Sequence, residues 1–209
     1  MKTPLKRPAR IVAALALKLC LFSLLIGQGP KPSATSTIEE VQIPAPSLAG
    51  NVLGDPATQQ VFIYLPPSYK SETAKRFPTL YLLHGYSGRP EEWVKGGYQG
   101  MTLQSEMDSL IAKGVAADMI VIVPNGRNAY LGGFYTNSDV TRNWEDYLYR
   151  DVVNYVDEKY RTLAKPASRG IAGHSMGGYG AFMLAMKHPD VFGSLYSLSP
   201  CCVGLEGDL

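Results

Sequence analysis

The sequence is poor in the residues that most often bind metals. It has three histidines and three cysteines among 209 residues, and none of them stands at a metal-ligand spacing. Internal repeats are absent, and so are the Gly-x-Gly-x-x-Gly and Walker spacings of phosphate-binding loops. We therefore expect neither a metal nor a cofactor.

Acidic residues are missing from the first 30 positions. Five of the 20 Lys+Arg lie there and none of the 18 Asp+Glu does, so the remaining chain has 15 basic and 18 acidic residues, and 15 minus 18 gives a net charge of −3. No basic patch remains that would indicate a nucleic-acid partner. The overall charge of +2 is thus a property of the N-terminal segment.

Residues 1–30 have the pattern of a secretory signal peptide. The apolar run Ile11 to Ile26 follows four basic residues, Lys2, Lys6, Arg7 and Arg10. The run is about 16 residues long, short of the roughly 20 that a membrane-spanning helix needs, and Lys18 interrupts it. We predict a protein that is secreted or held in the periplasm or cell envelope. An uncleaved N-terminal anchor is the alternative, and it is the only membrane association that we expect.

Residues 31–37 are rich in Pro, Ser and Thr and predict a linker, so the folded domain is expected over 38–209. Short apolar runs then alternate with helical patterns. Strands are predicted at Val61–Pro66, Thr79–Gly85, Met119–Gly126, Arg169–Gly173 and Ser194–Pro200, and helices at Met101–Lys113, Trp144–Tyr160 and Met176–Lys187. This alternation predicts an α/β fold with a mostly parallel sheet covered by helices on both faces. Asn143 is the expected N-cap of the middle helix.

The motif Gly173-His174-Ser175-Met176-Gly177 directly follows one of the predicted strands. Gly-x-Ser-x-Gly occurs by chance, so its context decides. Here an apolar strand leads into the motif and a helix with small residues in its first turns leaves it, which is the arrangement of a nucleophile elbow. Such a strained turn presents the serine above the sheet, and glycines remove collisions with neighbouring elements. The alternative is an ordinary glycine-rich turn.

A second candidate element is "LLHGYSG", Leu82 to Gly88, at the end of an earlier predicted strand. In hydrolases with a nucleophile elbow, the loop after this strand supplies one N–H of the oxyanion hole, and the residue after the nucleophile supplies the other. We therefore predict that the N–H groups of Tyr86 and Met176 bind the oxyanion. Each such donor is worth about 3 kcal/mol in the transition state. A plain turn is the alternative.

Between Val61 and Pro200 the chain contains, in order, "LYLLHGYSG", "IVIVPNG", "GGFYTNS", "NWEDYLYRDVVNYVDEKYR" and "GIAGHSMGGYGAFMLAMKHPDVFGSLYSLSP". In these segments it resembles an esterase family of the α/β-hydrolase fold that includes S-formylglutathione hydrolases (esterase D), feruloyl and acetyl-xylan-type esterases, and mycolyltransferases. The resemblance implies that Ser175 is the nucleophile, that Met176 and Tyr86 form the oxyanion hole, and that the reaction is acyl transfer from an ester.

The chain departs from this family in its general base. The α/β-hydrolase triad runs in the order serine, acid, histidine, but only 34 residues follow Ser175. His188 should lie roughly 20 Å away at the far end of the following helix. His174 is expected to pack beside the site, and His84 to stand near the pocket mouth, where it is at best a substitute base. Asp190 should follow that helix on the far side of the sheet, and no strand places Glu206 or Asp208 as the acid. We therefore expect a C-terminally truncated domain whose last strands are missing, with an apolar sheet edge and little activity.

Three hypotheses follow for the function. The first is an exported serine ester hydrolase acting on carbohydrate-linked or other small acyl esters. The second is an envelope acyltransferase, and the third is a non-catalytic binding protein on the same fold. Aromatic residues that could stack on sugars or aryl groups, or simply pack in loops, are Trp93, Tyr98, Tyr130, Phe134 and Tyr135. Adjacent Cys201 and Cys202 are expected to be free or to pair with other cysteines.

Overall fold

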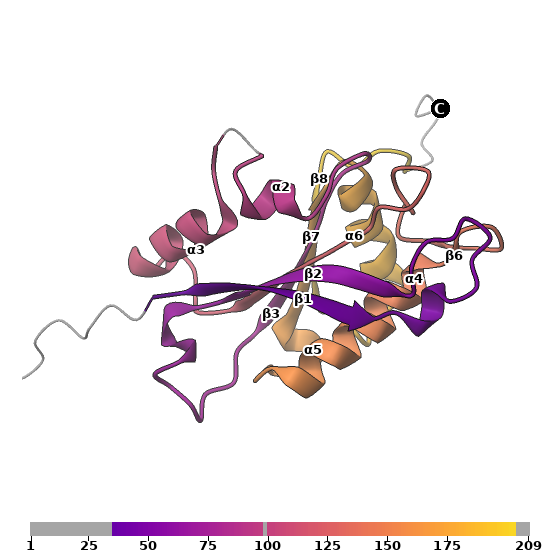
Figure 1. Ribbon diagram of the computed structural model, residues 1–209. Helices are drawn as coiled ribbons and strands as arrows, with labels where there is room; N and C mark the ends of the chain where they lie inside the picture. The colour runs from indigo at the N-terminus through magenta and orange to yellow at the C-terminus, as the bar shows by residue number, and fades with distance from the viewer. Residues whose placement is uncertain (1–34, 98–99, 204–209) are drawn as a thin grey trace, which may run out of the picture. The chain divides into compact units, whose positions relative to one another are not determined.

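The computed structural model describes residues 35–97 and 100–203 (Figure 1). They contain a six-stranded sheet in the order β1-β2-β4-β3-β7-β8 and a two-stranded sheet, β5-β6. Of the six strands, β2 alone runs in the direction opposite to the other five, so the predicted mostly parallel sheet is confirmed. The strands are β1 (Thr37–Pro44), β2 (Thr58–Leu65), β3 (Thr79–Leu83), β4 (Ile120–Pro124), β5 (Asn137–Ser138), β6 (Arg142–Asn143), β7 (Arg169–His174) and β8 (Ser194–Leu198).

The three predicted helical regions are present, and a short further helix, α2 (Glu91–Val94), was not predicted. The other helices are α3 (Leu103–Ala112), α4 (Trp144–Asp146), α5 (Val153–Lys159) and α6 (Met176–Lys187). A π-helical segment, η3 (Tyr147–Val152), joins α4 to α5, so the long predicted helix is continuous but locally wider. Short 3-10 turns are η1 (Pro46–Leu48), η2 (Pro67–Tyr69) and η4 (Pro166–Ser168).

Neighbouring residues of the central strands alternate between two hydrophobic layers. Ile63 of β2 belongs to the layer formed with α5 and α6, whereas the next residue, Tyr64, belongs to the layer that contains Met107 of α3. The same alternation separates Ile122 from Val121 in β4. Both faces of the sheet are therefore covered by helices, as predicted, and Figure 1 shows α2 and α3 on the opposite side of the sheet from α4 and α5.

Strand β1 is absent from the sequence-based prediction, and the folded part begins earlier than expected. Thr37 is already in β1, and Ser36, which the prediction places in the linker, is 2% exposed. The Ser36 hydroxyl donates to Asp108 of α3 at 2.7 Å, and this bond fixes the start of β1 against that helix. The predicted signal peptide and residues 31–34 of the linker lie outside the described residues. Within the described ranges, no helix is long and apolar enough to cross a membrane.

Asn143 occupies the N-cap position of the α4–α5 helix, as predicted, but its side chain makes no capping hydrogen bond. Asn137 of β5 does so instead, because its Oδ1 accepts from the backbone N–H groups of Glu145 and Asp146 at 3.1 and 3.2 Å. The small β5-β6 sheet thus caps the helix from outside its own sequence.

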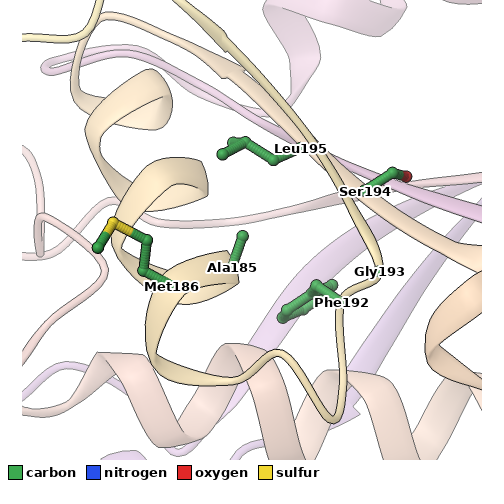
Figure 2. Close-up of a pocket in the computed structure, with 6 residues that line it drawn as sticks. All are labelled: Ala185, Met186, Phe192, Gly193, Ser194 and Leu195. Atoms are coloured by element: carbon green, nitrogen blue, oxygen red, sulfur yellow. The ribbon is translucent and has the colours of Figure 1, made fainter.

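Strand β8 forms an open edge of the sheet, because among the described residues it pairs with β7 alone. Leu195 and Tyr196 are 41% and 67% exposed there, so the predicted apolar edge is present. A cavity of about 210 Å³ lies between this edge and the last turns of α6. Figure 2 shows Leu195 reaching toward α6 while Ser194 points to the other side of the strand. Ala185 and Met186 line the cavity from the end of α6 opposite to Ser175.

A buried ion pair joins the sheet to α5. The guanidinium of Arg169 at the start of β7 donates to Asp157, with 6% and 21% of the two side chains exposed. Asp157 also accepts from the Thr162 hydroxyl at 2.7 Å, and Arg169 donates to the Val191 carbonyl at 2.9 Å. Because the Arg169 guanidinium is nearly inaccessible to water, its positive charge is stabilised by the Asp157 carboxylate.

We expect Asp157→Asn to lower the free energy of unfolding by about 2 to 3 kcal/mol, because it leaves a buried guanidinium without its counter-charge. Urea denaturation followed by circular dichroism measures the change. Glu158→Gln is the matched control on the same helix: Glu158 is 71% exposed in its pair with Lys159, and its removal should leave the midpoint unchanged. Equal effects of the two substitutions would contradict the assignment.

Candidate active site

Ser175 occupies a sharp turn between β7 and α6. Its φ is 56° and its ψ is −118°, a conformation that residues with side chains rarely adopt. Hydrogen bonds hold the turn on both sides: the Ser175 N–H donates to the Leu198 carbonyl at 3.0 Å, and the Ser175 carbonyl accepts from Tyr179 N–H at 2.9 Å. The strained conformation is thus fixed by the end of β8 and by the first turn of α6.

Three glycines make this turn possible. A Cβ at Gly173 would lie 2.3 Å from the Gly177 carbonyl oxygen, and a Cβ at Gly177 would lie 2.3 Å from the Leu83 carbonyl oxygen of β3. At Gly178 the obstacle is the Leu198 carbonyl oxygen, at 2.7 Å. Each obstacle is backbone, which cannot rotate away as a side chain can. The sequence-based reason for the glycines, close approach of the neighbouring strands and helix, matches the observed contacts.

The loop after β3 lies directly beside this turn. A Cβ at Gly85 would be 3.5 Å from the Cβ of Ser175. Gly132 contacts both predicted oxyanion residues, because a Cβ there would be 2.4 Å from the Met176 sulfur and 3.0 Å from the Tyr86 ring. Within the described ranges, the backbone N–H groups of Tyr86 and Met176 donate to no protein acceptor. The arrangement leaves two N–H groups near Ser175 that could bind an anionic oxygen.

His84 does not stand at a pocket mouth as expected, because its side chain is fully buried. Its Nδ1–H donates to the Gly85 carbonyl at 2.9 Å, and its Nε2 accepts from the Gly126 N–H at 2.8 Å. Burial lowers the pKa of His84 below its usual 6.5. Both ring nitrogens are therefore occupied, and this histidine holds two loops together instead of accepting a proton from Ser175.

The other two histidines occupy different positions. His188 ends α6, where its Nε2 lies 2.9 Å from Oε1 of Glu145 and its ring stacks on Tyr149 at 3.7 Å. His188 therefore contacts Glu145 and Tyr149 at the end of α6 opposite to Ser175. His174 is the last residue of β7, and its Nδ1 would lie 3.9 Å from a Cβ at Gly85, so its ring lies beside the loop after β3. Neither His84 nor His188 is positioned as a base for Ser175.

Aromatic side chains gather next to Tyr86. Its ring centroid lies 5.9 Å from that of Phe134, which in turn lies 6.2 Å edge-on from Tyr179. Tyr86 is 50% exposed and Tyr130 is 57% exposed. Tyr179 was not among the predicted site residues, although it lies four residues after Ser175 and so on the same side of α6.

The other aromatic candidates have different surroundings. Trp93 of α2 packs against the hydrophobic layer of α3, and Tyr135 is 1% exposed in the core. Both are therefore packing residues, and Tyr98 lies outside the described residues.

Cys201 is a second neighbour of Ser175 that the sequence analysis did not assign to the site. Its N–H donates to the Ser175 carbonyl at 3.4 Å. Burial raises the pKa of this thiol to about 11, so it is protonated at neutral pH and is no base. Topology could have indicated the contact, because the carboxyl ends of the adjacent parallel strands β7 and β8 meet at one edge of the sheet.

Gly177→Ala should destabilise the fold. The added methyl group would overlap the Leu83 carbonyl, which we expect to cost about 1 to 3 kcal/mol, more than the gain of up to about 1 kcal/mol in helix propensity. Chemical denaturation measures the difference. Gly85→Ala is the control, because the nearest atoms to its new Cβ lie at an ordinary 3.5 Å. A Gly177→Ala protein as stable as Gly85→Ala would show that the turn is looser than the contacts imply.

The lowered pKa of His84 predicts a loss of stability in mild acid. Above about pH 6.5 the ring is neutral in the folded and unfolded chains, so it contributes no pH dependence. Below that pH the unfolded chain binds a proton that the folded chain does not, so the free energy of unfolding falls until the lower folded pKa is reached. The loss is about 1.4 kcal/mol for each unit by which the pKa is lowered.

Urea denaturation of the wild type and of His84→Gln at several pH values between about 5 and 7.5 tests this titration. The variant should lose less stability than the wild type on acidification, whatever its stability at neutral pH. Parallel pH profiles would mean that His84 protonates equally well in both states.

Comparison with known proteins agrees with this geometry. An esterase of Mycobacterium tuberculosis is 30% identical over 143 residues, which are 66% of this chain and 28% of that protein. An endo-1,4-beta-xylanase/feruloyl esterase of Xylanibacter ruminicola is 28% identical over 65% of this chain and 18% of that protein. The solved structure of a ferulic acid esterase superposes with a TM-score of 0.68 at 28% identity, covering 81% of this chain and 60% of that one.

The matched segment spans less than a third of the length of these two relatives. A model of a whole family, described as "Putative esterase", matches residues 55–204, which include β3, β7 and the turn at Ser175. Together with the α/β-hydrolase sheet and its strand-to-helix turn, this match shows that the chain belongs to that esterase family.

Proposed function

We propose that this protein is an exported serine ester hydrolase that works through an acyl-enzyme on Ser175. The observation that carries the proposal is the conformation of Ser175, with φ 56° and ψ −118° between a parallel strand and a helix. This is the geometry that a nucleophile elbow requires. Holding a serine in a strained turn without a functional reason would only cost stability.

The proposed chemistry uses three groups of the chain. The Ser175 oxygen attacks the carbonyl carbon of the ester, and the N–H groups of Met176 and Tyr86 bind the oxygen on which negative charge develops. The alcohol leaves with a proton, and the acyl group stays on Ser175 until water, or another alcohol in an acyltransferase, attacks it. Gly132 supports this assignment, since it packs against both residues whose N–H groups would bind the oxyanion.

The aromatic residues beside Tyr86 favour a flat acyl or sugar group as substrate. The ring of Tyr179 lies about one helical turn after Ser175 on α6. It contacts the ring of Phe134, which in turn contacts the ring of Tyr86. Aromatic side chains of this kind bind aryl groups and sugar rings. Two relatives are described as feruloyl or ferulic acid esterases, which supports carbohydrate-linked aryl or acyl esters as the substrate class. The predicted signal peptide supports action outside the cytoplasm.

Neither His84 nor His188 can serve as the general base for Ser175. His84 and His188 are engaged elsewhere, and the Cys201 thiol is too weak an acid to be present as thiolate at neutral pH. Loss of the base from a serine triad costs a factor on the order of 10⁶ in kcat. A form of the protein in which no base reaches Ser175 should therefore turn over esters very slowly. The same placement of the histidines favours a second candidate, a non-catalytic protein that binds such esters.

Imidazole rescue separates these candidates. With 4-nitrophenyl acetate, added imidazole should accelerate release of nitrophenol by the wild type more than by Ser175→Ala, because the small base takes the proton that neither His84 nor His188 is placed to accept. Mass spectrometry should find the acetyl group on Ser175. The Ser175→Ala protein serves as the matched control, since it measures the direct reaction of imidazole with the ester.

Two outcomes would change the proposal. Fast Ser175-dependent turnover without imidazole would contradict the missing base and would point to His174, the histidine adjoining the serine. Identical rates for the wild type and Ser175→Ala, with no acetyl group on Ser175, would favour the binding protein.

A further inference from the structure

The loop after β4 folds around one buried side chain, that of Asn128, which is 5% exposed. Its Oδ1 accepts from the Tyr130 N–H at 2.9 Å and from the Gly132 N–H at 3.1 Å. Its backbone carbonyl accepts from the Leu131 N–H at 2.9 Å. Asn128 thus binds three successive N–H groups of a loop whose residues 129–131 are exposed, and it fixes the path of the chain there.

The same loop is bonded to the loop that carries Tyr86. The Leu131 carbonyl accepts at 3.1 Å from the N–H of Ser87, the residue after Tyr86. Gly132 lies against both proposed oxyanion residues, because a Cβ there would be 2.4 Å from the Met176 sulfur and 3.0 Å from the Tyr86 ring. The position of Leu131 and Gly132 therefore constrains where Tyr86 lies relative to Met176.

Leu131 is held in a strained conformation. Its φ is 70°, in the left-handed region that residues with side chains rarely adopt. Such a conformation persists only where the surrounding contacts impose it. The two N–H groups that bind Asn128 Oδ1 belong to Tyr130 and Gly132, the residues on either side of Leu131. We expect Leu131 to relax, and its carbonyl to move away from Ser87, when this oxygen is removed.

The two polar atoms of the Asn128 side chain have different surroundings. Two N–H donors face Oδ1, which fixes the orientation of the amide, because Nδ2 in that place would set donors against donors. Nδ2 itself is buried and has no hydrogen-bond partner among the described residues. Of this side chain the loop therefore uses only the acceptor oxygen, and a substitution that keeps the oxygen should keep the loop in place.

We propose that Asn128 is a positioning residue for the oxyanion hole, because it holds Leu131 and Gly132 and so sets the position of Tyr86 against Met176. It acts through the Leu131 carbonyl and the Gly132 backbone rather than through contact with the ester. The inference rests on the proposed function, since it concerns the same two N–H donors. Those donors act when negative charge develops, so their displacement should lower kcat and leave KM unchanged.

The position of the loop is tested without any esterase activity, by amide hydrogen exchange measured by NMR. In Asn128→Ala the Ser87 amide should lose protection, because its acceptor, the Leu131 carbonyl, has moved. Asn128→Asp keeps an acceptor oxygen and should keep Ser87 protected. Asn137→Ala is the matched control: it also removes a side-chain oxygen that accepts from two backbone N–H groups, but it should leave Ser87 protected.

Two exchange results would overturn the proposal. One is an unchanged Ser87 amide in a folded Asn128→Ala protein. The other is loss of Ser87 protection in Asn128→Asp, since that variant keeps the oxygen on which the loop depends. If Asn128→Ala does not fold, Asn128→Asp decides the question by itself: a protected Ser87 amide supports the role of the oxygen, and an unprotected one contradicts it.

The effect on Ser175 is measured with 4-nitrophenyl acetate and imidazole, after the rate of Ser175→Ala is subtracted. Asn128→Ala should lower kcat by about 10²-fold with KM unchanged, because a small displacement of a catalytic group costs about that much. Asn137→Ala should keep the wild-type kcat even where it lowers stability. A folded Asn128→Ala protein with the wild-type kcat, or with only KM raised, would overturn the proposal. If the wild type shows no Ser175-dependent reaction, the proposed function fails, and exchange of the Ser87 amide still decides whether Asn128 holds the loop.

Discussion

The close approach of three backbones at Ser175 is the constraint on which the site depends. The carbonyl of Leu83 at the end of β3 and that of Leu198 at the end of β8 both press against the first turn of α6. Only glycine fits at the contact points, Gly177 and Gly178, because any side chain would overlap main-chain atoms. The same contact brings the loops after β3 and β8 to the serine, so the turn and its surroundings form together.

A second group of contacts joins the loops after β3 and β4 to α6. The Tyr135 hydroxyl donates to the His84 carbonyl at 3.0 Å, and the Tyr135 ring fills the space over Gly126 and Gly180. Through its own ring, His84 joins Gly85 to Gly126. One buried tyrosine and one buried histidine thus link the loops after β3 and β4 to α6. The position of Tyr86 beside Met176 follows from this network as much as from the residues that would bind substrate.

The sequence carries enough information for the parts of this fold that are continuous and apolar. β3, β4, β7, β8 and α6 are found within a few residues because buried strands and helices need apolar runs of a set period. β1 was missed because it is an edge strand, and four of its residues are exposed: Glu39, Glu40, Gln42 and Pro44. The capping role of Asn137 was missed because its acceptor atom reaches a helix that begins seven residues later.

The candidate site could be predicted from the sequence only where it depends on a local motif or on strand order. Ser175 and its glycines form a local motif, and the place of Tyr86 follows from strand order. The contact of Cys201 with Ser175 and the burial of His84 depend on how separate strands end in space, which no local pattern records. His84 shows the difference well: its neighbours in sequence suggest a loop near substrate, whereas its partner Gly126 lies 42 residues away.

The structure also separates two requirements of serine catalysis. The strained conformation of Ser175 is imposed by glycines and by carbonyl groups of β3 and β8, and no histidine takes part in those contacts. Placement of the proposed nucleophile and of the proposed oxyanion donors is therefore a property of the sheet and of α6, whereas transfer of the serine proton depends on whichever group reaches the hydroxyl.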